Sequence, residues 1–395
     1  MTAAAPVIPS IVDLARRLVA IPSQGGVDPP AEIIDAVAGW LAEHDLPPSV
    51  LMNGNGESVG LSVDIGSGTG PRFGLNACLD TAPFGDLGAW SSPPTGAAVR
   101  DGWLVGRGAA DSKIAIAIFA HLGVELAAQA EELAGTLVLL FDADEHTGRF
   151  GGIRAYTDSS APLDGVMIGY PGLDEIVVGA RGFWRARVHV SGRSAHSGSR
   201  RPAVANAVVK AAELVTRLNA VDLPADERDA VFPLGPKITV TGIAGGEGHS
   251  VVPDRCSVSV DIRLTPTFDA AWAEAVVRKT CASVDDEIPG RRPTVVEPDG
   301  TWPAYRLPET SRLAVALQTG ARQALGRDVP CAVAGPSNIG NLLATLGTEA
   351  TCGFGVAYRN LHGPDEAIDL SSVPAVYDAY LRAVQLLLGT PLNSC

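Results

Sequence analysis

Residues 136–146 read TLVLLFDADEH, an unbroken apolar run that ends in three acids and a histidine. The run TLVLLF predicts a strand buried on both faces, because a strand with one solvated face would alternate apolar and polar residues. In an open α/β sheet, the ligand crevice lies beyond the carboxyl ends of the strands. This stretch therefore predicts a core strand that delivers Asp142, Asp144, Glu145 and His146 to a functional site.

Further runs on either side extend the same pattern. Residues 72–79 and 164–169 predict two more buried strands, and residues 10–20, 30–44 and 113–132 have the apolar spacing of helices. Strands that alternate with helices indicate an α/β fold whose mainly parallel mixed sheet is covered by helices on both faces. A chain of 395 residues is long enough for two domains.

The pattern changes near residue 180. Residues 183–191 (FWRARVHVS) alternate strictly, as in a sheet with one solvated face, and a β-α-β-β-α order follows. We therefore expect a small α+β domain at residues 180–292, inserted into a larger domain formed by residues 1–179 and 293–395.

Charge and composition exclude several classes of function. Acidic residues outnumber basic ones 44 to 30, for a net charge of −14, which disfavours binding to nucleic acid or to anionic membranes. The most apolar stretch, residues 114–128, is too short to span a bilayer, and residues 1–9 lack a secretory pattern. Because no secretory pattern is seen, we expect a cytoplasmic protein. The six cysteines show no C-x-x-C spacing and are expected to be reduced.

Six short motifs with reactive side chains follow one another along the chain. They are CLDTAP at 78–83, GRGAADSK at 106–113, DEH at 144–146, YP at 170–171, GRSAHS at 192–197 and LHGPDE at 361–366. Each is weak alone. In this order they resemble the motifs of the zinc deacylases and exopeptidases that include acetylornithine deacetylase, succinyl-diaminopimelate desuccinylase and carboxypeptidase G.

The resemblance covers nearly the whole chain, but it departs from the family at the metal ligands. In the family, two zinc ions are bridged by the aspartate that corresponds to Asp111. Cys78 and Tyr170 stand where the family has a histidine and a carboxylate on the first ion. His146 replaces a glutamate on the second ion, whose histidine is matched by His362.

Ligand chemistry ranks these positions. Asp111, His146 and His362 form a His₂-carboxylate set, which is normal for a catalytic zinc with a position open to water. Cys78 and Tyr170 make a poorer set, because a phenol with a pKa of about 10 must lose its proton to bind zinc. We therefore expect one zinc ion, with the second weakly bound or absent. Cys78 has two other interpretations, a buried small side chain or a nucleophile.

The remaining site residues are implied by the resemblance. Glu145 matches the general base, and Asp80 matches an acid that orients the histidine replaced here by Cys78. His196 matches a histidine that polarises the scissile carbonyl across a dimer interface. The resemblance thus implies that residues 180–292 form a lid and dimerisation domain through which a homodimer assembles. Substrate contacts are expected at Arg263, Asn338 and Ser250, where Ser250 replaces an asparagine.

These expectations combine into one leading function and two rivals. The leading hypothesis is hydrolysis of a small N-acyl amino acid or dipeptide-like amide, with Glu145 as base. One rival is a metal-poor acyltransferase, cyclase or other biosynthetic enzyme that uses Cys78, Tyr170 and His146. The other is a non-catalytic binder of small carboxylates, which would have no need of a base such as Glu145.

Overall fold

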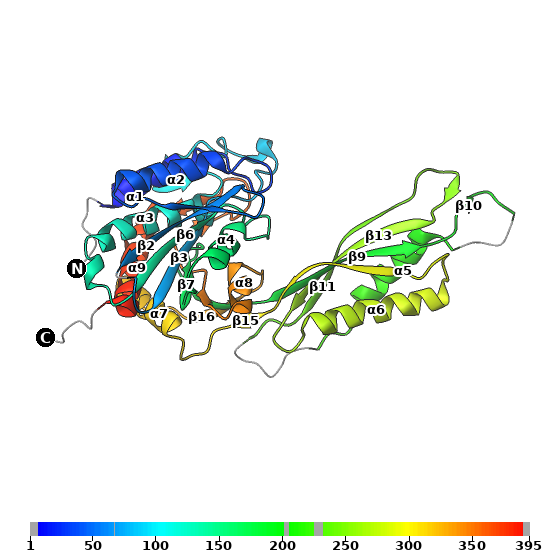
Figure 1. Ribbon diagram of the computed structural model, residues 1–395. Helices are drawn as coiled ribbons and strands as arrows, with labels where there is room; N and C mark the ends of the chain where they lie inside the picture. Colours follow the sequence, from blue (N-terminus) through cyan, green and yellow to red (C-terminus); the bar gives the residue numbers. More distant parts are fainter. Residues whose placement is uncertain (1–6, 67, 201–204, 225–231, 390–395) are drawn as a thin grey trace. The chain divides into compact units, whose positions relative to one another are not determined.

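The computed structural model describes residues 7–66, 68–200, 205–224 and 232–389, and the chain divides into two units (Figure 1). The first unit comprises Met1–Gly179, Leu307–Ala332 and Asn338–Cys395, and the second comprises Ala180–Arg306 and Val333–Ser337. Within the described ranges, no helix has the length and apolar character needed to cross a membrane.

The first unit is built on a six-stranded sheet with the order β1-β2-β6-β3-β7-β17. These strands are β1 (Ser49–Met52), β2 (Ser58–Gly66), β6 (Thr136–Asp142), β3 (Arg72–Cys78), β7 (Gly165–Ile168) and β17 (Glu349–Thr351). Strands β6, β3, β7 and β17 are parallel to one another, whereas β1 and β2 join as antiparallel strands. The predicted α/β class with a mainly parallel mixed sheet is confirmed.

Strand β6, the TLVLLF stretch, is buried along its whole length and shows how both faces of the sheet are covered. Leu137, Leu139 and Phe141 belong to the core with helices α1 (Val7–Val19), α2 (Ala31–Glu43), α3 (Ile114–Ala127), α7 (Arg312–Leu325) and α9 (Val373–Leu388). Side chains alternate along a strand, so Asp142 faces the other way. There it accepts a hydrogen bond from Ile153 of α4 (Gly151–Ser159), which packs on that face.

Short elements complete the first unit. A four-stranded sheet has the order β18-β19-β5-β4, made from β18 (Tyr358–Arg359), β19 (Ala367–Asp369), β5 (Trp103–Val105) and β4 (Ala98–Arg100). Helix α8 (Ile339–Thr345) precedes β17. The chain crosses between the two units within or beside the short strands β8 (Ile176–Ala180), β15 (Tyr305–Arg306) and β16 (Cys331–Ala334).

The second unit is an antiparallel sheet with helices on one face. Its strand order is β11-β13-β9-β14, from β11 (Lys237–Gly245), β13 (Arg255–Leu264), β9 (Gly182–Ser191) and β14 (Val295–Trp302). Alternate residues of β9 and β13 form a core with α5 (Ala207–Asn219) and α6 (Ala270–Glu287), as the alternation of residues 183–191 predicts. Two further short strands, β10 (Ala195–His196) and β12 (Val251–Val252), pair antiparallel.

The boundary expected at residue 292 is wrong. Strand β14 pairs with β9, and its Val296 is buried in the core of the second unit, which continues to Arg306 and also takes in residues 333–337. This strand was not recognised in the sequence because Pro298 and Gly300 interrupt its alternation of apolar and polar residues, at the point where the β14–β9 register shifts. Its assignment as a lid or dimerisation domain stays a prediction.

Candidate metal centre and active site

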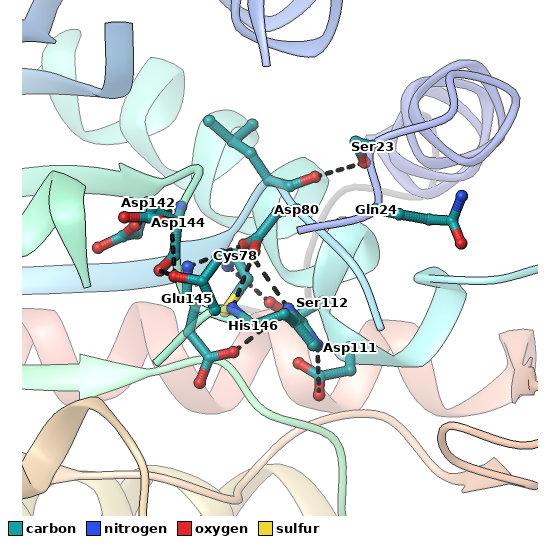
Figure 2. A network of polar contacts seen from close by, with 12 residues as sticks. Ser23, Gln24, Cys78, Asp80, Asp111, Ser112, Asp142, Asp144, Glu145 and His146 are labelled. Atoms are coloured by element: carbon teal, nitrogen blue, oxygen red, sulfur yellow. Dashed lines mark hydrogen bonds and ion pairs between the residues drawn. The ribbon is translucent and has the colours of Figure 1, made fainter. Parts of the chain in front are cut away.

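The ends of β3 and β6 bring the CLDTAP and DEH motifs together. Cys78 pairs in register with Asp142 across these parallel strands, so the residues that follow lie side by side. The buried Asp80 carboxylate accepts hydrogen bonds from the backbone N–H groups of Glu145 (3.1 Å) and His146 (2.8 Å), as Figure 2 shows. The histidine that Asp80 was expected to orient is Cys78 in this chain. In the structure Asp80 instead accepts hydrogen bonds from the backbone of the Glu145–His146 turn.

A buried ion pair connects the segments that carry Asp111 and His362. Arg107 Nη1 lies 2.5 Å from Glu366 Oε2, and both side chains are almost fully buried. Glu366 Oε1 accepts from the Ala110 N–H (3.0 Å), and Arg107 Nη2 donates to the carbonyl oxygen of His362 (2.9 Å). Sequence reasoning missed this pair, although both residues stand inside the GRGAADSK and LHGPDE motifs.

Asp111, His146 and His362 converge, with one potential ligand atom from each residue within 4.8 Å of the others. His362 Nε2 lies 3.0 Å and His146 Nε2 lies 3.6 Å from the same oxygen, Asp111 Oδ2. The rings of the two histidines are 5.4 Å apart. The three residues come from distant parts of the chain, so the fold rather than local sequence creates the cluster.

This cluster fits a divalent ion of the zinc type. Ligand bonds of about 2.0–2.1 Å in tetrahedral geometry separate neighbouring ligand atoms by about 3.3 Å, between the two distances found here. Asp111 Oδ1 and both ring nitrogens of His146 are buried without a regular hydrogen bond in the structure. Buried polar atoms without partners are costly, and an ion held by the cluster would give His146 Nε2 a partner.

The orientation of His146 also suits a ligand. Its Nδ1 lies 3.2 Å from Glu145 Oε2 and 3.6 Å from Asp80 Oδ1, which leaves Nε2 for the cluster. Burial alone would lower the pKa of the imidazolium, but the carboxylates of Asp111 and Asp80 outweigh it and raise the pKa of His146 to about 11. Burial would raise the pKa of Asp111, yet the two histidines hold it below its ordinary range.

Glu145 accepts a hydrogen bond from Tyr170, a residue expected to be a weak ligand of a second metal ion. The Tyr170 hydroxyl donates to Glu145 Oε1 at 2.6 Å. Burial raises the pKa of Glu145 to about 7; Asp111 adds to the rise, while His146 and the Tyr170 hydrogen bond oppose it. Burial also raises the pKa of Tyr170 well above 10, so its hydroxyl stays protonated. Tyr170, predicted as a weak ligand, is therefore placed as a hydrogen-bond donor to the expected base.

Cys78 is fully buried and does not belong to the three-residue ligand cluster. Burial, with Glu145, Asp111 and Asp80 nearby, raises the pKa of its thiol well above 9. A protonated thiol is a poor zinc ligand and a poor nucleophile. Burial therefore favours the interpretation of Cys78 as a small buried side chain.

The other predicted residues lie outside this cluster. In the second unit, His196 and Ser250 come together where β10 meets β12, and His196 Nδ1 accepts from the Gly198 N–H (3.0 Å). A neutral ring that accepts at Nδ1 carries its proton on Nε2, as a carbonyl-polarising donor requires. Arg263 pairs with Asp261 (2.9 Å). Asn338 caps α8, with its side chain accepting from Gly340. Their substrate contacts stay predictions.

The chain is similar to known proteins over most of its length. The chain is 28% identical over 334 residues to a succinyl-diaminopimelate desuccinylase of Cereibacter sphaeroides, covering 80% of this chain and 84% of that protein. It is 27% identical over 390 residues to the enzyme of the same name from Rhodospirillum rubrum, covering 94% and 96%.

Solved structures and a family profile extend the match. An M20 family metallo-carboxypeptidase from Sulfolobus solfataricus superposes with a TM-score of 0.76 at 17% identity, covering 95% of this chain and 98% of that one, which shows a shared fold. The profile of peptidase family M20/M25/M40 matches residues 74–386. The resemblance seen in the six motifs is thereby confirmed, and the chain belongs to the peptidase family M20/M25/M40, a family of hydrolytic enzymes.

Proposed function

We propose that this protein hydrolyses the amide bond of a small N-acyl amino acid or dipeptide-like substrate, with one divalent metal ion at Asp111, His146 and His362. The observation that carries the proposal is the convergence of these three side chains, whose buried Asp111 Oδ1 and His146 nitrogens lack regular hydrogen bonds. The curated relatives are named as desuccinylases, which remove an acyl group from an amino acid.

The chain's own residues supply the proton transfers. A bound metal ion would polarise water and the substrate carbonyl. Glu145 takes a proton from water as the water oxygen adds to the amide carbon. Glu145 then gives that proton to the amide nitrogen when the C–N bond breaks. The products are a carboxylic acid and an amine. A pKa near 7 suits a group that must accept and release a proton in turn.

Tyr170 and Asp80 fix the base and its neighbour. Tyr170 holds Oε1 of Glu145, and Asp80 holds the backbone of Glu145 and His146. The second oxygen of Glu145 faces His146 Nδ1 at 3.2 Å. With Tyr170 protonated and committed to Glu145, and Cys78 protonated, these two positions are poor ligands, which supports one ion rather than two.

The homodimer belongs to the same proposal. His196 and Ser250 share one end of the second unit, and His196 is exposed with its proton-bearing Nε2 available to a carbonyl. We assign His196 and Arg263 to substrate contact, with Arg263 binding a carboxylate. Size-exclusion chromatography with light scattering tests the dimer, and a monomer would remove the reason for assigning His196 across an interface.

The test of the reaction starts from chelated protein. Zinc, manganese, cobalt or nickel is added back in steps, and release of free amine is measured from succinyl-, acetyl- and formyl-amino acids and from dipeptides. We expect turnover that saturates near one ion per chain. Glu145→Gln should lower the rate by about 10²-fold or more, because it removes the proton acceptor. Cys78→Ala, the control, should keep the rate within a few-fold.

Other results would separate the rivals. Activity that survives chelation but is lost in Cys78→Ala would support the acyl-transfer reading. Saturable binding of small carboxylates, seen as a melting shift without turnover of any amide, would support a non-catalytic binder. Protein that neither retains nor takes up a metal ion would contradict the proposal itself.

A further inference from the structure

The sheet of the second unit has an exposed face that is rich in cations. Trp184, Ala186 and Val188 of β9 are buried under α5 and α6, so the alternate residues Arg185 and Arg187 point to the opposite face. Both are exposed. On β9 this face is therefore charged rather than apolar.

The strand register places further cations beside these two. Lys237 of β11 is opposite Arg263 of β13, and Arg185 of β9 is opposite Asp261 on the next row. Arg187 follows one row further along β9. Neighbouring strands are about 5 Å apart and successive rows about 7 Å apart, so four cations share a patch of about 10 by 14 Å.

A hollow of about 530 Å³ lies over this patch. Five of its lining residues are cations, Arg181, Arg185, Arg187, Lys237 and Arg263, against two acids, Asp261 and Asp299. The lining thus carries a net charge of +3 on a chain whose net charge is −14. The concentration of positive charge at one place is opposite in sign to the protein as a whole.

Asp261 arranges two of the guanidinium groups. Its Oδ2 accepts from Arg185 Nε at 2.8 Å and its Oδ1 lies 2.9 Å from Arg263 Nε. The guanidinium of Arg185 also lies over the Phe183 ring, 4.3 Å from its centroid. The Asp261 carboxylate thereby holds both arginines, and the Phe183 ring also holds Arg185. The ion pair of Arg185 uses its Nε, so the terminal nitrogens of that guanidinium are not used in this contact.

Arg187 and Lys237 differ from Arg185 and Arg263 in their acidic contacts. Glu297 of β14 is in register with Arg187 but pairs with His189. Across the described part of the chain, neither Arg187 nor Lys237 forms an ion pair with an acid. Arg181 donates to the carbonyl oxygens of Gly335 (3.0 Å) and Gly235 (3.1 Å), and burial together with Arg263 lowers its pKa. Cations held this close repel one another, and a bound anion would relieve that repulsion.

We propose that this face binds a compact anion that carries two or more negative charges, of the phosphate or dicarboxylate type. The hollow has the size of a small-molecule site, and the net charge of −14 disfavours a long polyanion such as nucleic acid. The proposal goes beyond a single carboxylate contact at Arg263 and does not depend on the hydrolytic reaction.

The experiment measures binding without turnover. Inorganic phosphate and succinate are titrated into the full chain by calorimetry at constant low ionic strength, with acetate as the monovalent probe. We expect one saturable site per chain for at least one dianion and weaker binding of acetate. Arg187→Gln combined with Lys237→Gln breaks no ion pair and should weaken that binding about tenfold or more, because two charge-assisted contacts are lost.

The matched control removes the same charges elsewhere. Arg17 on α1 and Lys279 on α6 are exposed, and their double change to glutamine should alter the dissociation constant less than threefold. The proposal is overturned if the wild type shows no saturable dianion binding, or if both double variants lose affinity equally. It is also overturned if a short DNA duplex binds more tightly than either dianion.

Discussion

Tyr170→Phe removes one hydroxyl from the site and leaves the ring in place. The lost group donates to Glu145 Oε1 at 2.6 Å in a partly buried site. This hydrogen bond stabilises the ionised carboxylate and so lowers the pKa of Glu145 against the rise that burial causes. Its removal must therefore raise the pKa of Glu145 further.

The size of the shift follows from the strength of the bond. A hydrogen bond to a charged group is worth about 1.5–3 kcal/mol, and one pKa unit corresponds to about 1.4 kcal/mol, so the pKa should rise by about one to two units. Glu145 has a pKa of about 7 with the hydroxyl present. At pH 7 the ionised fraction would fall from about one half to about one tenth or less. The base must be ionised to take a proton, so the rate should fall about fivefold or more at pH 7 and recover above pH 9.

Two measurements check this. The acid limb of kcat/KM against pH should move upward by one to two units, and ¹³C NMR of protein labelled at glutamate Cδ should show the same shift in metal-free protein, with Glu145→Gln identifying the signal. A bound cation lowers the pKa of Glu145 in both proteins, so the difference between them persists. Cys78→Ala is the control and should move the limb by less than half a unit. An unmoved or downward-shifted limb in Tyr170→Phe would refute the assignment of Tyr170 as the donor.

Four further substitutions test other contacts of the site. His146→Ala or His362→Ala should weaken zinc binding by about 10²-fold or more in dye competition, since each removes one of three ligands, whereas Cys78→Ala should bind as the wild type does. Arg107→Met leaves the fully buried Glu366 without its ion pair and should lower the free energy of unfolding in urea by about 3–5 kcal/mol; a loss below 1 kcal/mol would contradict the contact. Gly25→Ala would place a Cβ 2.7 Å from Asp80 Oδ2 and 3.1 Å from His146 Cβ, so metal affinity should fall, whereas Gly39→Ala in α2 meets no atom within 4 Å and should leave it unchanged.

The fold could be predicted wherever the hydrophobic periodicity of the sequence is strong. The TLVLLF run becomes β6 at the centre of the sheet, and the alternation FWRARVHVS becomes β9. Prediction of the domain boundary failed at β14, where Pro298 and Gly300 interrupt the alternation and the pairing with β9 carries the information instead. Strand pairing is a long-range property, and no local period reports it.

For the candidate site, too, some features could be predicted from the sequence and others could not. Asp111, Glu145, His146 and His362 could be named because each stands in a short motif. The contacts that organise them could not, because they join residues far apart in sequence: Arg107 pairs with a residue 259 positions away, and Tyr170 binds one 25 positions away. Side-chain partners of this kind depend on the packed geometry, which motif order alone does not specify.

The replaced positions share one electrostatic consequence. The resemblance implies carboxylates in the zinc enzymes at the positions of His146 and Tyr170, so by that comparison this chain has two fewer negative charges. A site with one divalent ion instead of two has two fewer positive charges, and the changes cancel. An unmatched charge in a buried site costs several kcal/mol, which makes either loss alone unfavourable. Cys78 replaces a neutral imidazole with a neutral thiol and leaves the balance intact. The substitutions therefore fit a site rebuilt around one ion better than a two-ion site that has simply decayed.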